Sequence, residues 1–179
     1  MNEFSRLDAT LIRSLLTHLA AEIRPTDATT LTIVGGAYLA LLGLRESTID
    51  IDSITPLSAG LRETIAELGE RHGLPHNWLN DHARAFAPRA TDHRDVTVIF
   101  EAPQLKVVGL PLTEIFLMKL ARASAADIGD MRILWPLVAE FFGSSRVVVD
   151  EFYRAFPLEP FDEYLEDFVA SIITEAGKK

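Results

Sequence analysis

The spacing of apolar and polar positions divides the chain into helical and extended segments. Residues 5–23 repeat apolar side chains at helical intervals, whereas residues 31–34 and 95–100 are short β-branched runs typical of strands. Further strands are expected at 49–54 and 105–108, and further helices at 37–44, 61–72, 81–86, 113–122, 125–131, 133–142, 147–156 and 161–173. The strands lie before residue 110 and the helices dominate after it. This order predicts an α+β fold, with a small mixed sheet flanked by helices and a C-terminal helical extension.

The length of 179 residues suits one domain, or one domain with a small extension. We expect residues 1–110 to form the α/β core. Residues 111–179 are expected to form a helical subdomain packed on that core.

One stretch, residues 31–55, contains most of the candidate functional residues. It reads LTIVGGAYLALLGLRESTIDIDSIT and predicts a strand, a Gly35-Gly36 turn, a short helix and a second strand that holds Asp50 and Asp52. Side chains two apart on a strand share a face, so the two carboxylates are expected side by side, with the isoleucines free to pack.

This stretch combines two features that suit phosphoryl or nucleotidyl transfer. Glycines after a strand let backbone N–H groups approach an anion, and the following helix turns its positive end to the same place. Adjacent carboxylates repel each other unless a cation lies between them, and Mg²⁺ prefers carboxylate and phosphate oxygens. We therefore expect Gly35 and Gly36 to hold phosphate, and Asp50 and Asp52 to bind Mg²⁺ or Mn²⁺.

The pattern resembles the signature of the polymerase-β-like nucleotidyltransferase superfamily, a Gly-Gly or Gly-Ser turn followed by Asp-x-Asp on a strand. It is most similar to the small prokaryotic nucleotidyltransferase-like proteins related to the AbiEii toxins, in which Arg and Thr stand before Asp-Ile-Asp, as Arg45 and Thr48 do here. The resemblance implies a nucleotidyltransferase-type sheet, a nucleoside triphosphate substrate and an RNA (tRNA-like) or protein acceptor. It also implies a toxin–antitoxin role with an antitoxin partner.

A second part of the resemblance lies in the helical region. Lys119 stands on a Lys-Leu helix and is followed by Asp127 and Asp130, as in the family's Lys helix, turn and Asp-x-x-Asp segment. The resemblance implies that Lys119 is catalytic and that Arg45 and Lys119 steady the nucleotide phosphates, unless Arg45 pairs with a nearby acid. Asp127 and Asp130 are either part of the nucleotide site or helix-start carboxylates.

Two further expectations rest partly on the resemblance. Related enzymes place a third carboxylate on the strand next to Asp-x-Asp, and Asp95 is the best candidate for this third metal ligand, with Glu101 at the other end of its strand. The family also has a Trp-Leu-Asn segment like Trp78-Leu79-Asn80. Trp78 either stacks on a nucleotide or fills the edge of the core.

Composition limits the remaining choices. Without cysteine the chain has no disulfide and no thiolate zinc site, and no apolar run is long enough to span a membrane. A cytoplasmic protein without a membrane partner is the simplest expectation. The net charge of −9 argues against a general nucleic-acid binder, so an RNA acceptor would have to meet the one locally basic stretch, Arg84, Arg89 and Arg94.

Two alternatives remain open. The chain could be a catalytically reduced family member that acts as a binding module, because its third carboxylate is uncertain. Asp50-Ile51-Asp52 also superficially fits the nucleophile motif of haloacid-dehalogenase-type phosphatases. That motif needs an apolar strand before the first Asp, whereas Arg45 to Thr48 precede it here.

Overall fold

The computed structural model describes residues 6–89 and 95–178 and divides them into two compact units. The first unit contains residues 6–85 and 96–110. The second contains residues 86–89, 95 and 111–178. Each unit is described by itself.

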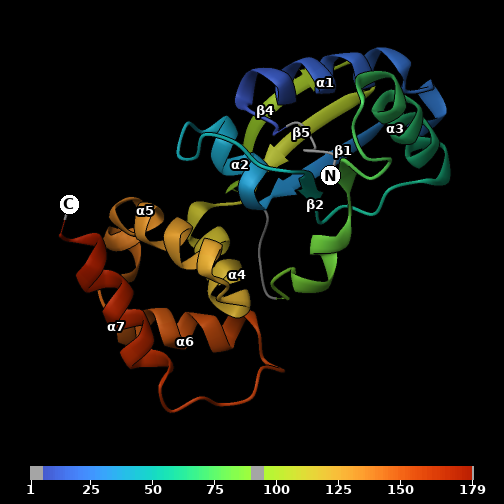
Figure 1. Cartoon of the computed structure of the whole chain (residues 1–179). Coiled ribbons are helices and arrows are strands. Elements are labelled where there is room, and N and C mark those ends of the chain that lie inside the picture. Colours follow the sequence, from blue (N-terminus) through green and yellow to red (C-terminus); the bar gives the residue numbers. More distant parts are fainter. Residues whose placement is uncertain (1–5, 90–94, 179) are drawn as a thin grey trace. The chain divides into compact units, whose positions relative to one another are not determined.

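The first unit is built on a five-stranded mixed sheet, which confirms the expected α+β class (Figure 1). Its order is β3-β2-β1-β5-β4. β1 runs parallel to β5 and antiparallel to β2, β2 runs parallel to β3, and β4 runs antiparallel to β5. The strands are β1 (Thr29–Val34), β2 (Ile51–Ser53), β3 (Leu79–Asn80), β4 (Thr97–Ala102) and β5 (Leu105–Gly109).

Three helices accompany this sheet, α1 (Ala9–Glu22), α2 (Gly35–Leu41) and α3 (Ala59–His72), together with the 3-10 turns η1 (Pro25–Asp27) and η2 (His82–Phe86). α1 contacts α2, α3 and β4, and its buried stripe includes Leu15 and Leu19. The expected periodicity of α1 and α3 is confirmed, because their apolar positions face this common core.

The Asp-Ile-Asp strand is shorter than expected. Only Ile33 and Val34 of β1 pair with β2, because the chain turns into α2 at Gly35 and the ladder ends there. Asp50 therefore lies in a bend before β2 instead of within it. The expectation that Ile49 packs is wrong, since it is 65% exposed, whereas Ile51 is fully buried.

The second unit is helical and comprises α4 (Leu112–Arg122), α5 (Ala125–Phe142), α6 (Ser145–Ala155) and α7 (Leu165–Ala176). α5 is one continuous helix with Pro136 inside it, where two segments were expected, and α7 begins four residues later than expected. Rings of Phe116, Trp135 and Phe142 pack together in its core.

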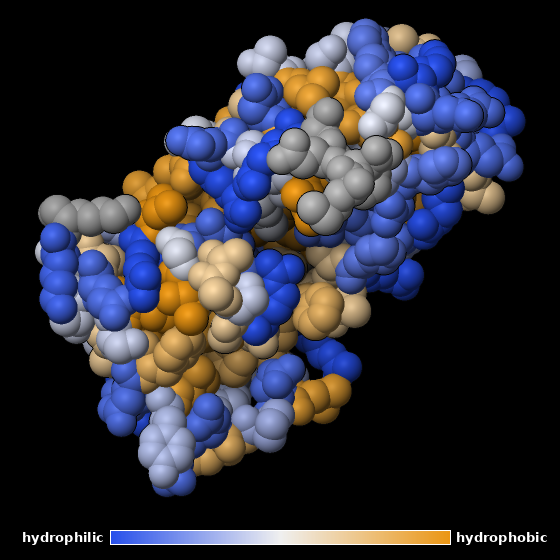
Figure 2. Space-filling model, in the orientation of Figure 1, coloured by the Kyte–Doolittle hydropathy of each residue, from blue (hydrophilic) through white to orange (hydrophobic). Residues whose placement is uncertain are grey.

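Apolar side chains also reach the surface among hydrophilic ones (Figure 2). Those of the second unit are Phe86, Leu137, Phe141, Val147, Leu158, Phe161 and Tyr164. Over the part of the chain that the structure describes, none of the helices has the length and apolar character needed to cross a membrane.

Candidate functional site

The turn after β1 depends on Gly35. Its φ of +67° is a left-handed conformation that side chains other than glycine rarely adopt. A Cβ at this position would lie 3.3 Å from Oδ2 of Asp52, so the glycine backbone and the Asp52 carboxylate are close neighbours. The residue before it, Val34, is the N-cap of α2 and gives no side-chain hydrogen bond to the helix start. The predicted proximity of the glycine turn and one of the carboxylates is therefore present in the fold.

Gly36 makes a second close approach. A Cβ here would lie 2.7 Å from Thr48 Oγ1 and 3.4 Å from Arg45 Nη1, so the helix start and the segment before Asp-Ile-Asp fit together only without a side chain. Thr48 is buried and is held by the N-terminal segment, since it exchanges backbone hydrogen bonds of 2.8 and 2.9 Å with Leu7. Arg45 Nε donates to the Ser47 carbonyl oxygen at 2.9 Å.

Asp50 and Asp52 are both half-buried. Asp52 is paired in register with Val34 of β1, and within the described residues no hydrogen bond or ion pair engages its carboxylate. Asp50 precedes the strand. The expected alternation of side chains between the two faces of a strand therefore fixes the direction of Asp52 but not that of Asp50. A phosphatase nucleophile would follow an apolar strand, whereas Asp50 follows turn and bend residues, which counts against the phosphatase alternative.

Asn80 stands next to Asp52 in the sheet. The parallel pairing of β2 and β3 sets the two residues in register, which places their side chains on the same face. Asn80 is buried, and its Oδ1 accepts a hydrogen bond of 2.9 Å from His82 N, so the amide's Nδ2 is the end left to donate. Among the described residues this Nδ2 has no acceptor. A buried donor therefore stands beside the Asp52 carboxylate.

The sequence pointed to Asn80 only through the family-like Trp-Leu-Asn segment. Periodicity could not identify β3, because a strand of two residues has no pattern to read.

The order of the sheet gives no support for Asp95 as the third metal ligand. The strands beside β2 are β1 and β3, whereas the strand that follows Asp95 is β4, at the opposite edge. The expectation that the Asp95 strand neighbours Asp-Ile-Asp is therefore wrong. Over residues 6–89 and 95–178, no group of three or more His, Asp or Glu side chains is arranged to hold a metal ion.

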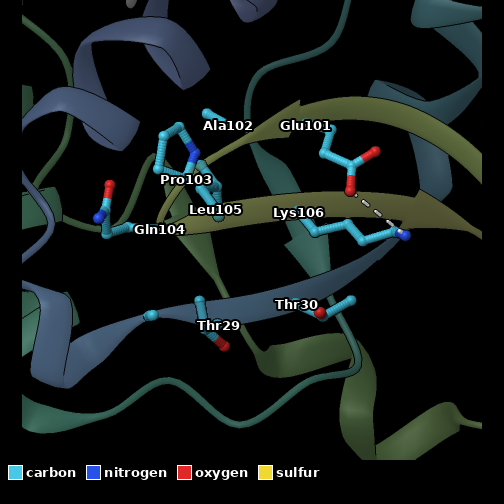
Figure 3. A pocket seen from close by; sticks show the side chains of 9 residues that line it. Thr29, Thr30, Glu101, Ala102, Pro103, Gln104, Leu105 and Lys106 are labelled. Atoms are coloured by element: carbon cyan, nitrogen blue, oxygen red, sulfur yellow. Dashed lines mark ion pairs between the residues drawn. The ribbon is translucent and has the colours of Figure 1, made fainter.

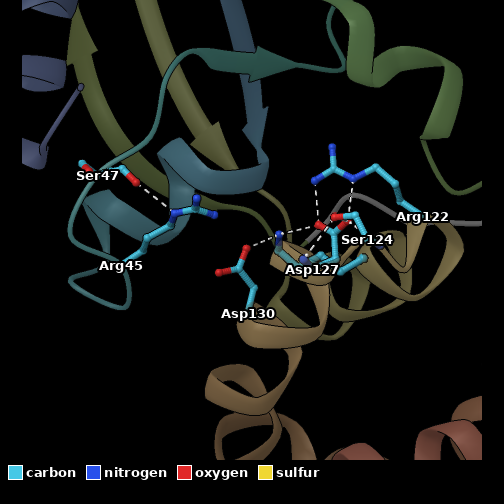
Figure 4. Close-up of polar contacts among 7 residues, drawn as sticks. Arg45, Ser47, Arg122, Ser124, Asp127 and Asp130 are labelled. Carbon is cyan, nitrogen blue, oxygen red and sulfur yellow. Dashed lines mark hydrogen bonds and ion pairs between the residues drawn. The ribbon is translucent and has the colours of Figure 1, made fainter. Parts of the chain in front are cut away.

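In the second unit, Arg122, Ser124, Asp127 and Asp130 lie in a cluster of polar contacts (Figure 4), and Lys119 pairs with both of its carboxylates. The Lys119 side chain is 4% exposed, and Nζ donates to Asp127 Oδ1 at 3.2 Å and to Asp130 Oδ2 at 2.6 Å. Arg122 adds two bonds to Asp127, at 2.7 Å from Nε and 2.6 Å from Nη2. Lys119 interrupts an apolar stretch of sequence because it neutralises two buried carboxylates.

Asp127 is also the partner in a capping box. Its N–H donates to Ser124 Oγ, while its carboxylate accepts from the Ser124 backbone N at 3.2 Å. Burial by itself would raise the pKa of Asp127. The hydrogen bonds from Arg122 and Ser124 and the charge of Lys119 outweigh burial and hold this pKa well below its ordinary value. The capping interpretation of Asp127 is thus confirmed, and its carboxylate is permanently charged near neutral pH.

The predicted residues therefore fall into two groups. Gly35, Gly36, Arg45 and Thr48 meet around the helix start of the first unit, with Asp52 over Gly35. Lys119, Asp127 and Asp130 form the cluster of the second unit. Of the basic stretch, Arg84 and Arg89 are exposed in the first and second unit respectively, and Arg94 lies outside the described residues.

Trp78 belongs to the core of the first unit. It is fully buried, and its Nε1 donates to the Ile65 carbonyl oxygen at 2.8 Å. A ring held in this way is not available to stack on a nucleotide, so the alternative that it fills the core is confirmed.

A depression at the other end of the sheet is remote from the glycine turn. It is lined by Thr29 and Thr30 at the start of β1 and by residues 101–106 of the β4–β5 hairpin (Figure 3). Gly35 follows the opposite end of β1. This depression therefore does not belong to the predicted site.

Comparison with known proteins agrees with the geometry of the first unit. No curated protein and no solved structure gives a significant match. The model of one protein family, described as nucleotidyltransferase of unknown function (DUF6036), matches residues 12–134, which include the glycine turn, Asp-Ile-Asp and the Lys119 cluster. Because the match spans more than half of the chain, the chain belongs to this family of nucleotidyltransferases.

Proposed function

We propose that the chain transfers a nucleoside monophosphate from a nucleoside triphosphate to an acceptor hydroxyl, with release of pyrophosphate. The observation that carries the proposal is the contact between Gly35 and Asp52. A glycine in the left-handed conformation at a helix start and a half-buried carboxylate lie together, and no partner within the described residues engages that carboxylate. An anion nest beside an unneutralised carboxylate is what a metal-bound triphosphate needs.

The donor set suits a divalent hard cation. Asp50 and Asp52 would hold Mg²⁺ or Mn²⁺ through carboxylate oxygens, and Asn80 offers an N–H donor next to Asp52. A bound cation would neutralise charge on the triphosphate and favour attack at the α-phosphate. With two carboxylates, binding would depend strongly on the substrate's own phosphates.

The chain's own groups would then orient the substrate. The backbone N–H groups at Gly35 and Gly36 would bind phosphate oxygens, and Arg45, whose guanidinium lies against Gly36, would add positive charge there. Lys119, Asp127 and Asp130 remain predicted site residues. In this structure they neutralise one another, so a role toward phosphate would require Lys119 to exchange a carboxylate for the substrate.

The acceptor is proposed from the likeness to AbiEii-related toxins. An RNA end or a protein hydroxyl would be modified in a prokaryotic cytoplasm, and an antitoxin would restrain the activity. The reduced binding module stays the second candidate, because the described residues contain no three-membered acidic group for a metal.

Calorimetric titration with each nucleoside triphosphate, with and without Mg²⁺, tests the proposal. We expect Mg²⁺-dependent binding that an Asp50→Asn/Asp52→Asn double variant weakens by at least tenfold. Equal binding by wild type and variant would overturn the metal site. Incubation with labelled triphosphates and total RNA or lysate then separates the two candidates, since a binding module would bind nucleotide without labelling any acceptor.

A further inference from the structure

A small cavity adjoins Asp50 in the first unit. It has a volume of about 230 Å³ and is lined by Ile49, Asp50, Pro75, Asn77 and Trp78. This is below the roughly 300–1,000 Å³ of pockets that enclose whole small-molecule ligands. It suits a single planar ring system better than an entire nucleotide.

The cavity lies at the same end of the sheet as the glycine turn. β2 and β3 are parallel and both begin here, with Ile51 N donating to the Trp78 carbonyl oxygen at 2.7 Å. β1 is antiparallel to β2, so its last residue, Val34, lies toward the start of β2, and Gly35 follows it. Gly35 and the cavity therefore lie at the same end of the sheet, and Asp50, which lines the cavity, comes two residues before Asp52.

The walls of the cavity are preformed. Trp78 N donates to the Pro75 carbonyl oxygen at 3.0 Å, which closes a turn over residues 75–78. The turn packs closely on α3, because a Cβ on Gly69 would lie 2.8 Å from the Pro75 carbonyl oxygen and 2.9 Å from the Trp78 ring. Binding here would not have to order the loop, which lowers the entropy cost of binding.

The chemistry of the lining selects a neutral, flat and partly polar group. Ile49 exposes 65% of its surface beside a carboxylate, although its neighbour Ile51 is completely buried. Asn77 is also exposed and carries both an N–H donor and a carbonyl acceptor. None of the five lining residues is basic, so the cavity offers no positive charge to an anion. A heteroaromatic base meets all three conditions, because it has an apolar face, a donor–acceptor edge and no charge.

We propose that this cavity binds the heteroaromatic base of a nucleotide, with Ile49 against the face of the base and Asn77 at its hydrogen-bonding edge. The inference rests on the proposed function, because it takes the glycine turn and Asp52 as the phosphate end of the same ligand. The base belongs either to the incoming triphosphate or to the terminal nucleotide of an RNA acceptor, and the experiment distinguishes these sources.

Calorimetry with Mn²⁺ and two kinds of probe tests this site. Inorganic tripolyphosphate carries the phosphates of every nucleoside triphosphate without a base, and ATP, GTP, CTP and UTP add the bases. We expect wild type to bind at least one nucleotide about tenfold more tightly than tripolyphosphate. Ile49→Ala and Asn77→Ala are expected to reduce that advantage about fivefold and to leave tripolyphosphate binding unchanged. Asn77→Ala should also change the order of preference among the four bases.

Val98→Ala is the matched control. Val98 is likewise a half-exposed β-branched residue of the first unit, but it lies on β4 at the far edge of the sheet. Its replacement should leave every affinity unchanged. All three substitutions are at exposed positions, so loss of folding is not expected to confuse the result.

The outcomes are distinct. If the variants keep nucleotide affinity but lose affinity for a short single-stranded RNA, the cavity binds the acceptor's base. If neither nucleotide nor RNA binding changes, the inference is wrong while the proposed function stands. If wild type binds neither tripolyphosphate nor any nucleotide in the presence of Mn²⁺, the proposed function itself fails.

Discussion

Asp127 in the second unit and Asp52 in the first differ in whether a positive charge neutralises the carboxylate. Asp127 is fully buried and is neutralised by Lys119 and Arg122 and capped by Ser124. Asp52 is half-buried beside Gly35, and no cation of the described residues pairs with it. A satisfied charge contributes to folding, whereas a charge that is positioned but not neutralised is available to a ligand. The comparison separates a carboxylate that is neutralised within the helical unit from one that no described cation neutralises.

The largest expected effect is on the satisfied carboxylate. Asp127→Asn removes the negative charge between Lys119 and Arg122 and leaves a buried ammonium with one carboxylate fewer. Breaking a buried ion pair on one side costs about 3–5 kcal/mol of stability. Denaturant unfolding followed by circular dichroism measures this loss.

Asp52→Asn is the matched control for Asp127→Asn. It should change the free energy of unfolding by no more than about 0.5 kcal/mol, as for a substitution that removes no partner. Similar losses for the two variants would show that the contrast between the units is not real.

A smaller effect is expected at the glycine turn. Gly36→Ala places a Cβ 2.7 Å from Thr48 Oγ1, and overpacking of this kind costs about 1–3 kcal/mol. The double variant Gly36→Ala/Thr48→Ala should recover part of the stability, because the hydroxyl is then absent. Thermal unfolding of the single and double variants gives the comparison.

Gly129→Ala serves as the control for Gly36→Ala. Gly129 lies inside α5, and a Cβ there meets nothing within 4 Å, so alanine should stabilise the helix by about 0.5–1 kcal/mol. If both glycine variants were equally stable, the close approach at Gly36 would not constrain the fold.

The smallest effect concerns a carboxyl group in α4 and depends on pH. Burial raises the pKa of Glu114 from 4.5 to about 7, and its Oε2 has no hydrogen-bond partner in the described part of the chain. Between these two pKa values the folded protein holds a proton that the unfolded chain has lost. Stability should therefore fall as pH rises from about 4.5 to about 7 and then level off.

Glu114→Gln should remove this part of the pH dependence and raise stability at pH 8 by roughly 1–2 kcal/mol, which is less than the full shift implies because the residue is only half-buried. Unfolding midpoints measured from pH 4.5 to 8 provide the check. A wild-type profile that rises over this range would contradict the assignment.

The sequence was informative where patterns are long or glycine is required. The helices with clear apolar stripes, the strand before Gly35 and the mixed sheet were all predictable, because burial imposes its period on the sequence. The closeness of Gly35 to Asp52 was predictable for another reason, because a strand, a tight turn and a returning strand leave few arrangements.

The sequence was uninformative where tertiary pairing decides. β2 is short because β1 ends at Gly35, and β3 exists only through its pairing with β2, so neither length could be read from local propensity. The pairing of β2 with β3 puts Asn80 beside Asp52, whereas the pairing of β4 with β5 puts the strand after Asp95 at the far edge. Whether Lys119 pairs with Asp127 and Asp130 or faces solvent also depends on the packing of two helices, which periodicity does not specify.

The backbone exchange between Leu7 and Thr48 has a practical consequence for anyone who handles the protein. Thr48 lies against Gly36, so the extended segment before α1 supports the glycine turn through Thr48. A purification tag or fusion partner attached in front of this segment would disturb the hydrogen bonds between Leu7 and Thr48. Fusions are better made after α7, which belongs to the other unit.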